Sequence, residues 1–196
     1  MLDIKKNNQK DIFLKAEKSS LGGFTIIEML VSVAIIGMIS GIFLVNYRGT
    51  NRRSELVGAA QKLASDARLV QNYSLGLKKA DIADANPPAG GWGIYINRAS
   101  TSYVLFADKN DPSGNRQYDN GEKVREIFFP KGVTVATNGI SVGGLSVPTS
   151  TIVFFPPDPL TYIKNSTTTN ISIILKDQDN STSTVRINFL GLIEVN

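Results

Sequence analysis

The 196-residue sequence contains no cysteine and no histidine. Without cysteine there is no disulfide framework, thiolate nucleophile or thiolate metal site. Without histidine the chain lacks the commonest general base and the commonest zinc ligand. A glycine-rich phosphate loop, a nucleophile elbow and a paired-carboxylate motif are also missing from the sequence. These absences predict a protein that is not an enzyme and that uses no cofactor.

Charge is nearly absent from residues 24–45, where Glu28 is the only charged side chain in 22 residues. As a helix this segment is roughly 33 Å long, enough to cross a hydrocarbon core of about 30 Å. Asn46, Tyr47 and Arg48 then suit the membrane interface. A secretory signal peptide has a shorter apolar core and a small-residue cleavage site, which residues 46–49 do not offer. The pattern predicts a transmembrane helix over residues 24–48.

The residues that open this segment, Gly23-Phe24-Thr25-Ile26-Ile27-Glu28, resemble the prepilin signature of type IV pilins and type II secretion pseudopilins. The resemblance implies a leader peptide over residues 1–23 that a prepilin peptidase/methyltransferase removes by cutting between Gly23 and Phe24. It also implies N-methylation of Phe24 and a role for Glu28 in filament assembly. An unprocessed single-pass anchor is the simpler alternative, and it leaves both the diglycine and Glu28 unexplained.

The role of Glu28 also has a physical basis that does not depend on the resemblance. A charge within a membrane helix costs about 2.5–3.5 kcal/mol on insertion scales, so it is expected to have a partner or a purpose. Cleavage after Gly23 creates an ammonium at Phe24, which can pair with Glu28 of a neighbouring subunit and set the register between them. The alternative is that Glu28 reaches the aqueous interface near the start of the helix.

Partners and location follow from the resemblance rather than from charge. Lysine and arginine occur on both sides of the apolar segment, so they do not fix its orientation. The resemblance implies a single-pass inner-membrane protein with its C-terminal domain outside the cytoplasm, which later joins a pilus or pseudopilus. The implied partners are other pilin or pseudopilin subunits, the peptidase, an inner-membrane assembly platform and the lipid bilayer.

An amphipathic helix is expected to continue over residues 49–79, with a break near Gly49. Its apolar stripe repeats every seven residues and has alanines at the four-residue offset. The stripe comprises Leu56, Ala60, Leu63, Ala67, Val70 and Leu77. Arg53, Lys62, Asp66 and Arg68 fall on the polar face. We expect the stripe to pack on the protein's own sheet, with packing against other subunits as the alternative. Gly37 and Gly41 form a Gly-x-x-x-Gly pair that permits close helix approach.

Residues 80–196 are rich in short β-type runs separated by turn residues. The expected strands are residues 92–96, 103–106, 124–129, 133–136, 152–155, 171–175, 185–189 and 192–195. This order predicts an α+β protein: a long N-terminal transmembrane and amphipathic helix followed by an antiparallel β domain, as in pilins. The element order and the Gly-Trp-Gly-Ile motif at residues 91–94 resemble the GspH/FimT group of minor pseudopilins.

One loop carries oxygen ligands at a density that suits calcium. The candidate ligands are Asp108, Asn110, Asp119 and Glu122, but their spacing does not match an EF-hand. Pro112 and Ser113 occupy positions where such a loop needs an acidic residue and a glycine. A polar hairpin connection explains the same residues through their turn preferences.

DNA binding at a filament tip is the alternative function, because some members of the GspH/FimT group bind DNA through basic residues near the C-terminus. Here that region has Arg186 and Glu194 in place of a basic cluster, although Lys123, Arg125 and Lys131 offer another patch. Removing the leader leaves 16 basic and 14 acidic side chains, which is not the charge of a general nucleic-acid binder. DNA is therefore not an expected partner.

Overall fold

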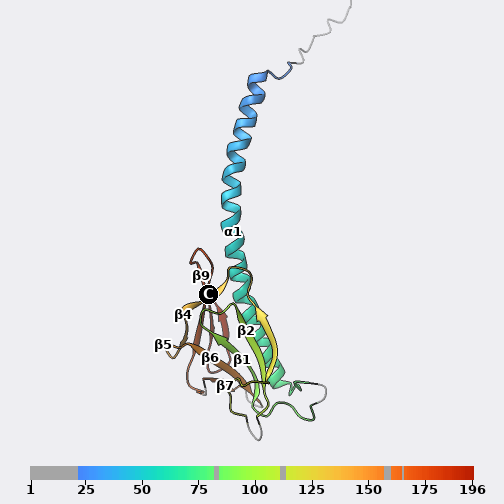
Figure 1. Cartoon of the computed structure of the whole chain (residues 1–196), viewed down its shortest axis with the longest axis vertical. Coiled ribbons are helices and arrows are strands. Elements are labelled where there is room, and N and C mark those ends of the chain that lie inside the picture. The colour runs from blue at the N-terminus through green and yellow to red at the C-terminus, as the bar shows by residue number, and fades with distance from the viewer. Residues whose placement is uncertain (1–21, 82–83, 111–113, 157–159, 165) are drawn as a thin grey trace, which may run out of the picture. The chain divides into compact units, whose positions relative to one another are not determined.

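The computed structural model describes residues 22–81, 84–110, 114–156, 160–164 and 166–196, without the side chains of residues 45–50. Within these residues one helix, α1 (Ile26–Leu75), is followed by ten strands. Figure 1 shows the helix and labels several of the strands. Contacts divide the chain into an N-terminal segment, Met1–Leu44, and a C-terminal domain, Val45–Asn196. The layout is α+β, as the order of elements in the sequence predicts.

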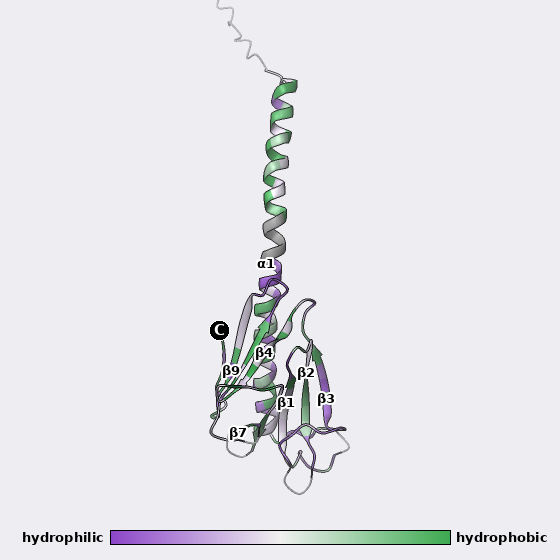
Figure 2. Ribbon diagram, turned by 60° about the vertical axis from the view of Figure 1, so that its left-hand side comes forward, coloured by the Kyte–Doolittle hydropathy of each residue, from purple (hydrophilic) through white to green (hydrophobic). Residues whose placement is uncertain are grey.

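The N-terminal segment is helical from Ile26, and all its described residues are exposed. Figure 2 shows the apolar character that continues along this part of α1. Ile26–Leu44 is long and apolar enough to cross a membrane, and none of it is buried within the structure. The predicted leader, residues 1–23, lies outside the described residues except for Gly22 and Gly23.

The C-terminal domain contains two five-stranded antiparallel sheets. The strand order is β3-β2-β1-β6-β7 in sheet A and β10-β9-β8-β4-β5 in sheet B. The strands of sheet A are β1 (Gly91–Asn97), β2 (Ser102–Asp108), β3 (Lys123–Phe128), β6 (Thr149–Phe155) and β7 (Leu160–Ile163). Those of sheet B are β4 (Thr134–Val142), β5 (Leu145–Ser146), β8 (Ile171–Lys176), β9 (Thr182–Ile187) and β10 (Ile193–Val195).

Alternation of apolar residues selects the buried face of each sheet. On β8, Ile171, Ile173 and Leu175 are buried, while the residues between them are half-buried. Ile173 lies directly opposite Val185 of β9, so both side chains enter the same core. Apolar residues of both sheets and of α1 form one hydrophobic cluster.

The part of α1 within this domain buries the predicted stripe. Leu56, Leu63 and Val70 are fully buried, as are Ala60 and Ala67, and all belong to the shared core. The alanines leave room for strands to approach the helix closely, whereas the larger residues fill the space between the sheets. The expectation that the stripe packs on the protein's own sheets is confirmed.

Asp66 is not on the polar face of the helix, and that assignment is wrong. Its side chain is 3 % exposed. The Tyr103 hydroxyl donates a 2.6 Å hydrogen bond to one carboxylate oxygen, and Lys62 donates a 2.7 Å bond to the other. These two donors satisfy a buried acid that would otherwise be costly. Burial, together with this hydrogen bond, raises the pKa of the Tyr103 phenol.

The helix ends two residues before the predicted last stripe position, Leu77. The Lys78 amide donates to the Tyr73 carbonyl and the Leu77 amide to the Ser74 carbonyl, which is the bonding of a Schellman cap. Leu77 adopts φ +49°, the left-handed conformation that glycine usually takes at this position. Its side chain is therefore outside the helix and 57 % exposed rather than buried in the stripe.

Three other boundaries differ from the sequence expectation. The helical backbone continues through Gly49, because one glycine costs only about 1 kcal/mol in a helix interior. The short strands β5 and β7 were not predicted, since neither has a long β-type run. β4 is longer than predicted, and its pairing with β8 is irregular between Val135 and Ile140.

Candidate functional site

The predicted processing site lies before the helix, where the backbone is open. Gly22, Gly23, Phe24 and Thr25 are non-helical and exposed. A methyl group built on either glycine meets no atom within 4 Å. Phe24 is 78 % exposed. The peptide bond between Gly23 and Phe24 is therefore exposed in a non-helical stretch that a protease can reach.

Thr25 caps the helix, a role that the sequence analysis did not assign. The Glu28 amide donates a 3.2 Å hydrogen bond to the Thr25 hydroxyl oxygen, and the Met29 amide donates to the Thr25 carbonyl. Thr25 and Glu28 have the Ser/Thr-x-x-Glu spacing of a capping box. That spacing was readable in the sequence. It gives part of the Gly23–Glu28 motif a local structural role, because the first turn of the helix has amide donors that need acceptors.

The Glu28 side chain is exposed in the first turn of α1. Among the residues that the structure describes, no hydrogen bond or ion pair engages its carboxylate. The positive end of the helix dipole favours a negative charge here by about 0.3–1 kcal/mol at an exposed site. This is less than the cost of placing the charge in a membrane, so the carboxylate can gain from an external cation.

The remainder of the N-terminal segment offers an apolar surface, one face of which carries two glycines and no large side chains at those positions. Large side chains such as Ile26, Met38 and Phe43 are each more than 60 % exposed. Gly37 and Gly41 lie one helical turn apart, and a methyl group built on either meets nothing within 4 Å. That face is thin enough for a second helix to approach closely.

The four candidate calcium ligands lie close together, joined by hydrogen bonds within the loop. Asp108 accepts bonds from the Asn110 and Arg116 amides, and Glu122 accepts from the Lys109 and Asp119 amides. The Asn110 side-chain amide donates to the Asp119 carboxylate. The carboxylate oxygens that calcium needs therefore already accept hydrogen bonds from N–H groups of this loop. No group of three or more acidic side chains positioned to hold a metal occurs among the described residues.

Burial divides the acids of this region into two classes. Asp108 and Glu122 are buried, and desolvation raises the pKa of Glu122 despite its two amide donors. Asp84 is ion-paired with Lys109 at 3.0 Å, and the hydrogen bond from that lysine lowers the pKa of Asp84. In this arrangement Asp108 and Glu122 hold the β2–β3 connection against the sheet through hydrogen bonds from its backbone amides.

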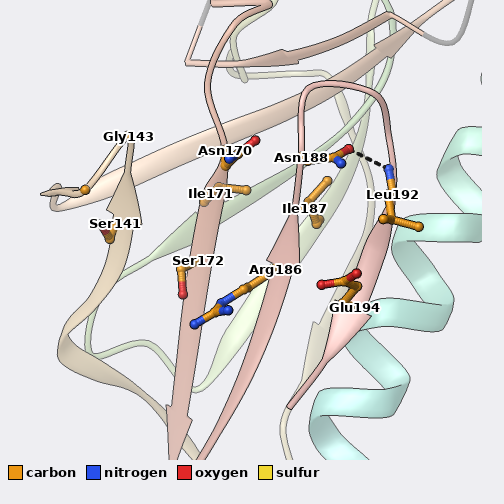
Figure 3. Close-up of a pocket in the computed structure, with 11 residues that line it drawn as sticks. Ser141, Gly143, Asn170, Ile171, Ser172, Arg186, Ile187, Asn188, Leu192 and Glu194 are labelled. Atoms are coloured by element: carbon orange, nitrogen blue, oxygen red, sulfur yellow. Dashed lines mark hydrogen bonds between the residues drawn. The ribbon is translucent and has the colours of Figure 1, made fainter.

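Arg186 and Glu194, the C-terminal residues considered for DNA binding, line a shallow groove of about 500 Å³ on the exposed face of sheet B (Figure 3). Arg186 on β9 lies directly opposite Glu194 on β10 and Ser172 on β8. The groove lining has one guanidinium and one carboxylate, so their charges offset each other. The Asn188 side-chain oxygen accepts hydrogen bonds from the Leu190 and Leu192 amides, which fixes the turn between β9 and β10.

The second basic patch is dispersed along β3 and beyond it. Lys123 begins the strand and is paired with Glu126 at 3.4 Å. Lys131 follows the other end of the strand and lines a different pocket, together with Glu55 and Asp177. Lys123 and Arg125 lie on β3 while Lys131 lines this other pocket, so the described contacts do not join the three into one basic track along a phosphate backbone.

Comparison with known proteins adds no family to this description. No family model, no curated protein and no solved structure matches the chain.

Proposed function

We propose that this protein is a structural subunit of a membrane-assembled filament, either a type IV pilus or a type II secretion pseudopilus. The proposal rests chiefly on one observation: Ile26–Leu44 is exposed throughout and is apolar apart from Glu28 and two serines, while the C-terminal domain has a complete core that contains none of it. Such a segment needs an apolar environment outside its own chain, which lipid and neighbouring helices both supply.

The proposed cycle exchanges one apolar environment for the other. In the bilayer, lipid covers the helix; in the filament, the same surface packs against helices of other subunits. Transfer between them leaves the C-terminal domain folded, because its core residues begin at Leu56. The resemblance of the N-terminal motif to prepilins and of the element order to the GspH/FimT group supports a minor subunit. In this role the chain needs no catalytic group.

Glu28 is proposed to select the neighbour. Processing after Gly23 places an ammonium on Phe24, and the carboxylate of Glu28 in an adjacent subunit is its partner. The unpaired state of Glu28 among the described residues supports this role, since leaving one member of a desolvated pair alone costs about 3–5 kcal/mol. The pair therefore favours the staggered arrangement that brings both groups together.

The first test is mass spectrometry of the N-terminus of the protein from its native membrane. The expected product begins at Phe24 and carries one added methyl group. Gly23→Val is expected to retain residues 1–23, because a branched side chain next to the scissile bond hinders the peptidase, whereas the two glycines leave that bond open. Gly37→Ala serves as the matched control and is expected to be processed normally. A native chain that begins at Met1 contradicts the proposal.

The second test is the Glu28→Val variant. We expect it to remain in the membrane and to be processed, but to be lost from filaments. The drop should be tenfold or more if the pair contributes about 1.4 kcal/mol or above. Glu55→Val removes an exposed acid from the domain part of the helix and is the control. Normal filament incorporation of Glu28→Val rules out the pairing, while processing at Phe24 still supports the class.

A further inference from the structure

The outer face of sheet A, opposite the helix, presents a row of side chains that the filament role does not use. Tyr95 on β1 lies directly opposite Val104 on β2 and Thr151 on β6. The Lys164 amide donates a 3.0 Å bond to the Thr151 carbonyl, which extends the row beyond β7. Residues that lie opposite in adjacent strands point to the same face.

The loop before β3 forms a wall along this face. The Tyr118 ring packs on Tyr95 at 4.8 Å between centroids and on Phe106 at 5.4 Å. The Arg116 guanidinium lies 4.1 Å from the centroid of the Tyr162 ring. Thr151 donates from its hydroxyl to the Arg116 carbonyl. These contacts fix the loop on the sheet and leave a recess at its edge.

The recess is a pocket of about 330 Å³. It is lined by Tyr95, Gln117, Tyr118, Thr149, Ser150, Thr151 and Lys164. The lining therefore combines two aromatic rings, several hydroxyl and amide groups, and one cation, with no carboxylate. Lys164 is exposed, and its ammonium has no ion pair or hydrogen bond among the described residues. A volume of this size accommodates one or two sugar rings.

We propose that this pocket binds an acidic sugar, that is, a pyranose ring bearing a single carboxylate or phosphate. The apolar face of such a ring packs on the Tyr95–Tyr118 pair, whose hydroxyls and that of the exposed Thr149 satisfy the sugar hydroxyls. Lys164 supplies a point charge for the anionic group. The composition distinguishes the recess from an ordinary polar sheet surface, where charges of both signs are interspersed.

A nucleic acid fits the pocket less well, although its bases also stack on aromatic rings. Single-strand binding combines stacking with a positively charged groove that follows several phosphates. Here one lysine lines the pocket, which matches a ligand with one anionic group. An uncharged sugar leaves Lys164 without a partner. The number of cations therefore favours an acidic sugar over both alternatives.

The test is a nuclear magnetic resonance titration of the full chain in detergent micelles. The probes are glucuronate and glucose 6-phosphate, with glucose as the neutral control, each up to tens of millimolar. We expect both anionic sugars to shift the amides of Thr149, Thr151 and Lys164, with glucose about tenfold weaker. Comparison of the two anions distinguishes a carboxylate from a phosphate as the preferred group.

Two variants and a control identify the contacts. Lys164→Gln is expected to weaken the anionic sugars about tenfold and to leave glucose unchanged. Tyr95→Thr is expected to weaken all three sugars, because it removes the ring. Lys131→Gln removes an exposed lysine that lines a different pocket, so it should change nothing. Since the wild-type shifts locate the site by themselves, the assignment does not depend on either variant folding.

Four results overturn the proposal. These are no amide shifts with glucuronate or with glucose 6-phosphate, shifts confined to another surface, equal affinity for glucose, and unchanged affinity for the anionic sugars in Lys164→Gln. A single-stranded oligonucleotide that binds here more tightly, with a salt dependence of several ions, assigns the pocket to nucleic acid instead. None of these results bears on processing at Phe24.

Discussion

The two parts of helix α1 use apolar residues in opposite ways. In Ile26–Leu44 such residues surround the helix and all are exposed. Beyond Leu56 they form one stripe, and that stripe is buried against two sheets. Polar side chains such as Gln61 and Ser65 occupy the face opposite the stripe.

The difference shows that the arrangement of apolar residues, rather than their number, decides what a helix needs. A stripe can be covered completely by the chain's own sheets. A helix that is apolar on all sides cannot be, and it requires lipid or several neighbouring helices. One part therefore stabilises the domain, whereas the other is available for assembly.

The sharpest way to break this comparison is to remove the same kind of side chain from each part. Leu63→Ala is expected to lower the free energy of unfolding of the C-terminal domain by about 2–5 kcal/mol, because it opens a cavity in the core. Ile35→Ala should leave that free energy unchanged. Denaturant unfolding of the full chain in detergent, followed by the near-ultraviolet signal of Trp92 against Tyr73, measures both. Equal losses would show that the two parts share one folding unit.

The buried Tyr103–Asp66 hydrogen bond makes the stability of the domain part depend on pH, which the exposed part should not share. The pKa of Tyr103 is raised above its ordinary value of 10.0, so the folded state keeps a proton that the unfolded state releases. Stability contributed by this group is present below pH 10 and decreases above it, by at most about 1.4 kcal/mol per pH unit. Tyr103→Phe should remove this alkaline slope. It should also cost about 1–2 kcal/mol at neutral pH, because Asp66 loses a donor. An unchanged slope in the variant assigns it to other groups.

At the start of the exposed part, Thr25→Val removes the capping oxygen and keeps the side-chain shape. We expect about 0.5–2 kcal/mol of local destabilisation, seen as faster hydrogen exchange at the amides of Ile27, Glu28 and Met29. Thr25→Ser retains the oxygen and should exchange like the wild type. The unfolding of the C-terminal domain should be the same in all three proteins. Equal exchange in the valine and serine variants would mean that the cap contributes nothing.

The smallest expected effect lies at the end of the buried part. Leu77→Gly places the preferred residue in the left-handed position of the helix cap. It should stabilise the domain by about 1 kcal/mol at most, because strain is relieved while unfolded-state entropy rises. Leu75→Gly, two residues earlier at the last helical position, is the contrast and should destabilise. Loss of stability in Leu77→Gly would indicate that the exposed leucine side chain makes a contribution of its own.

Local patterns were sufficient for most of the elements. The period of Leu56, Leu63 and Val70 predicted the buried face of α1, and short β-type runs between turn residues predicted eight of the ten strands. The pattern could not show that Leu77 leaves the helix, because a Schellman cap without glycine at its left-handed position has no strong sequence signal. The spacing of Thr25 and Glu28 did carry a signal for an N-terminal cap, but the charge of Glu28 alone does not predict it.

The sequence by itself determined that one segment has membrane-spanning length with a single acid, and that this segment precedes an α+β domain. These properties depend on residues that are neighbours along the chain. Only the tertiary structure decided that Asp66 is buried beneath Tyr103, that Arg186 lies opposite Glu194, and that Tyr95, Tyr118 and Lys164 line one recess. These residues meet through strand order and loop packing, which bring together side chains whose separation along the chain gives no indication of contact.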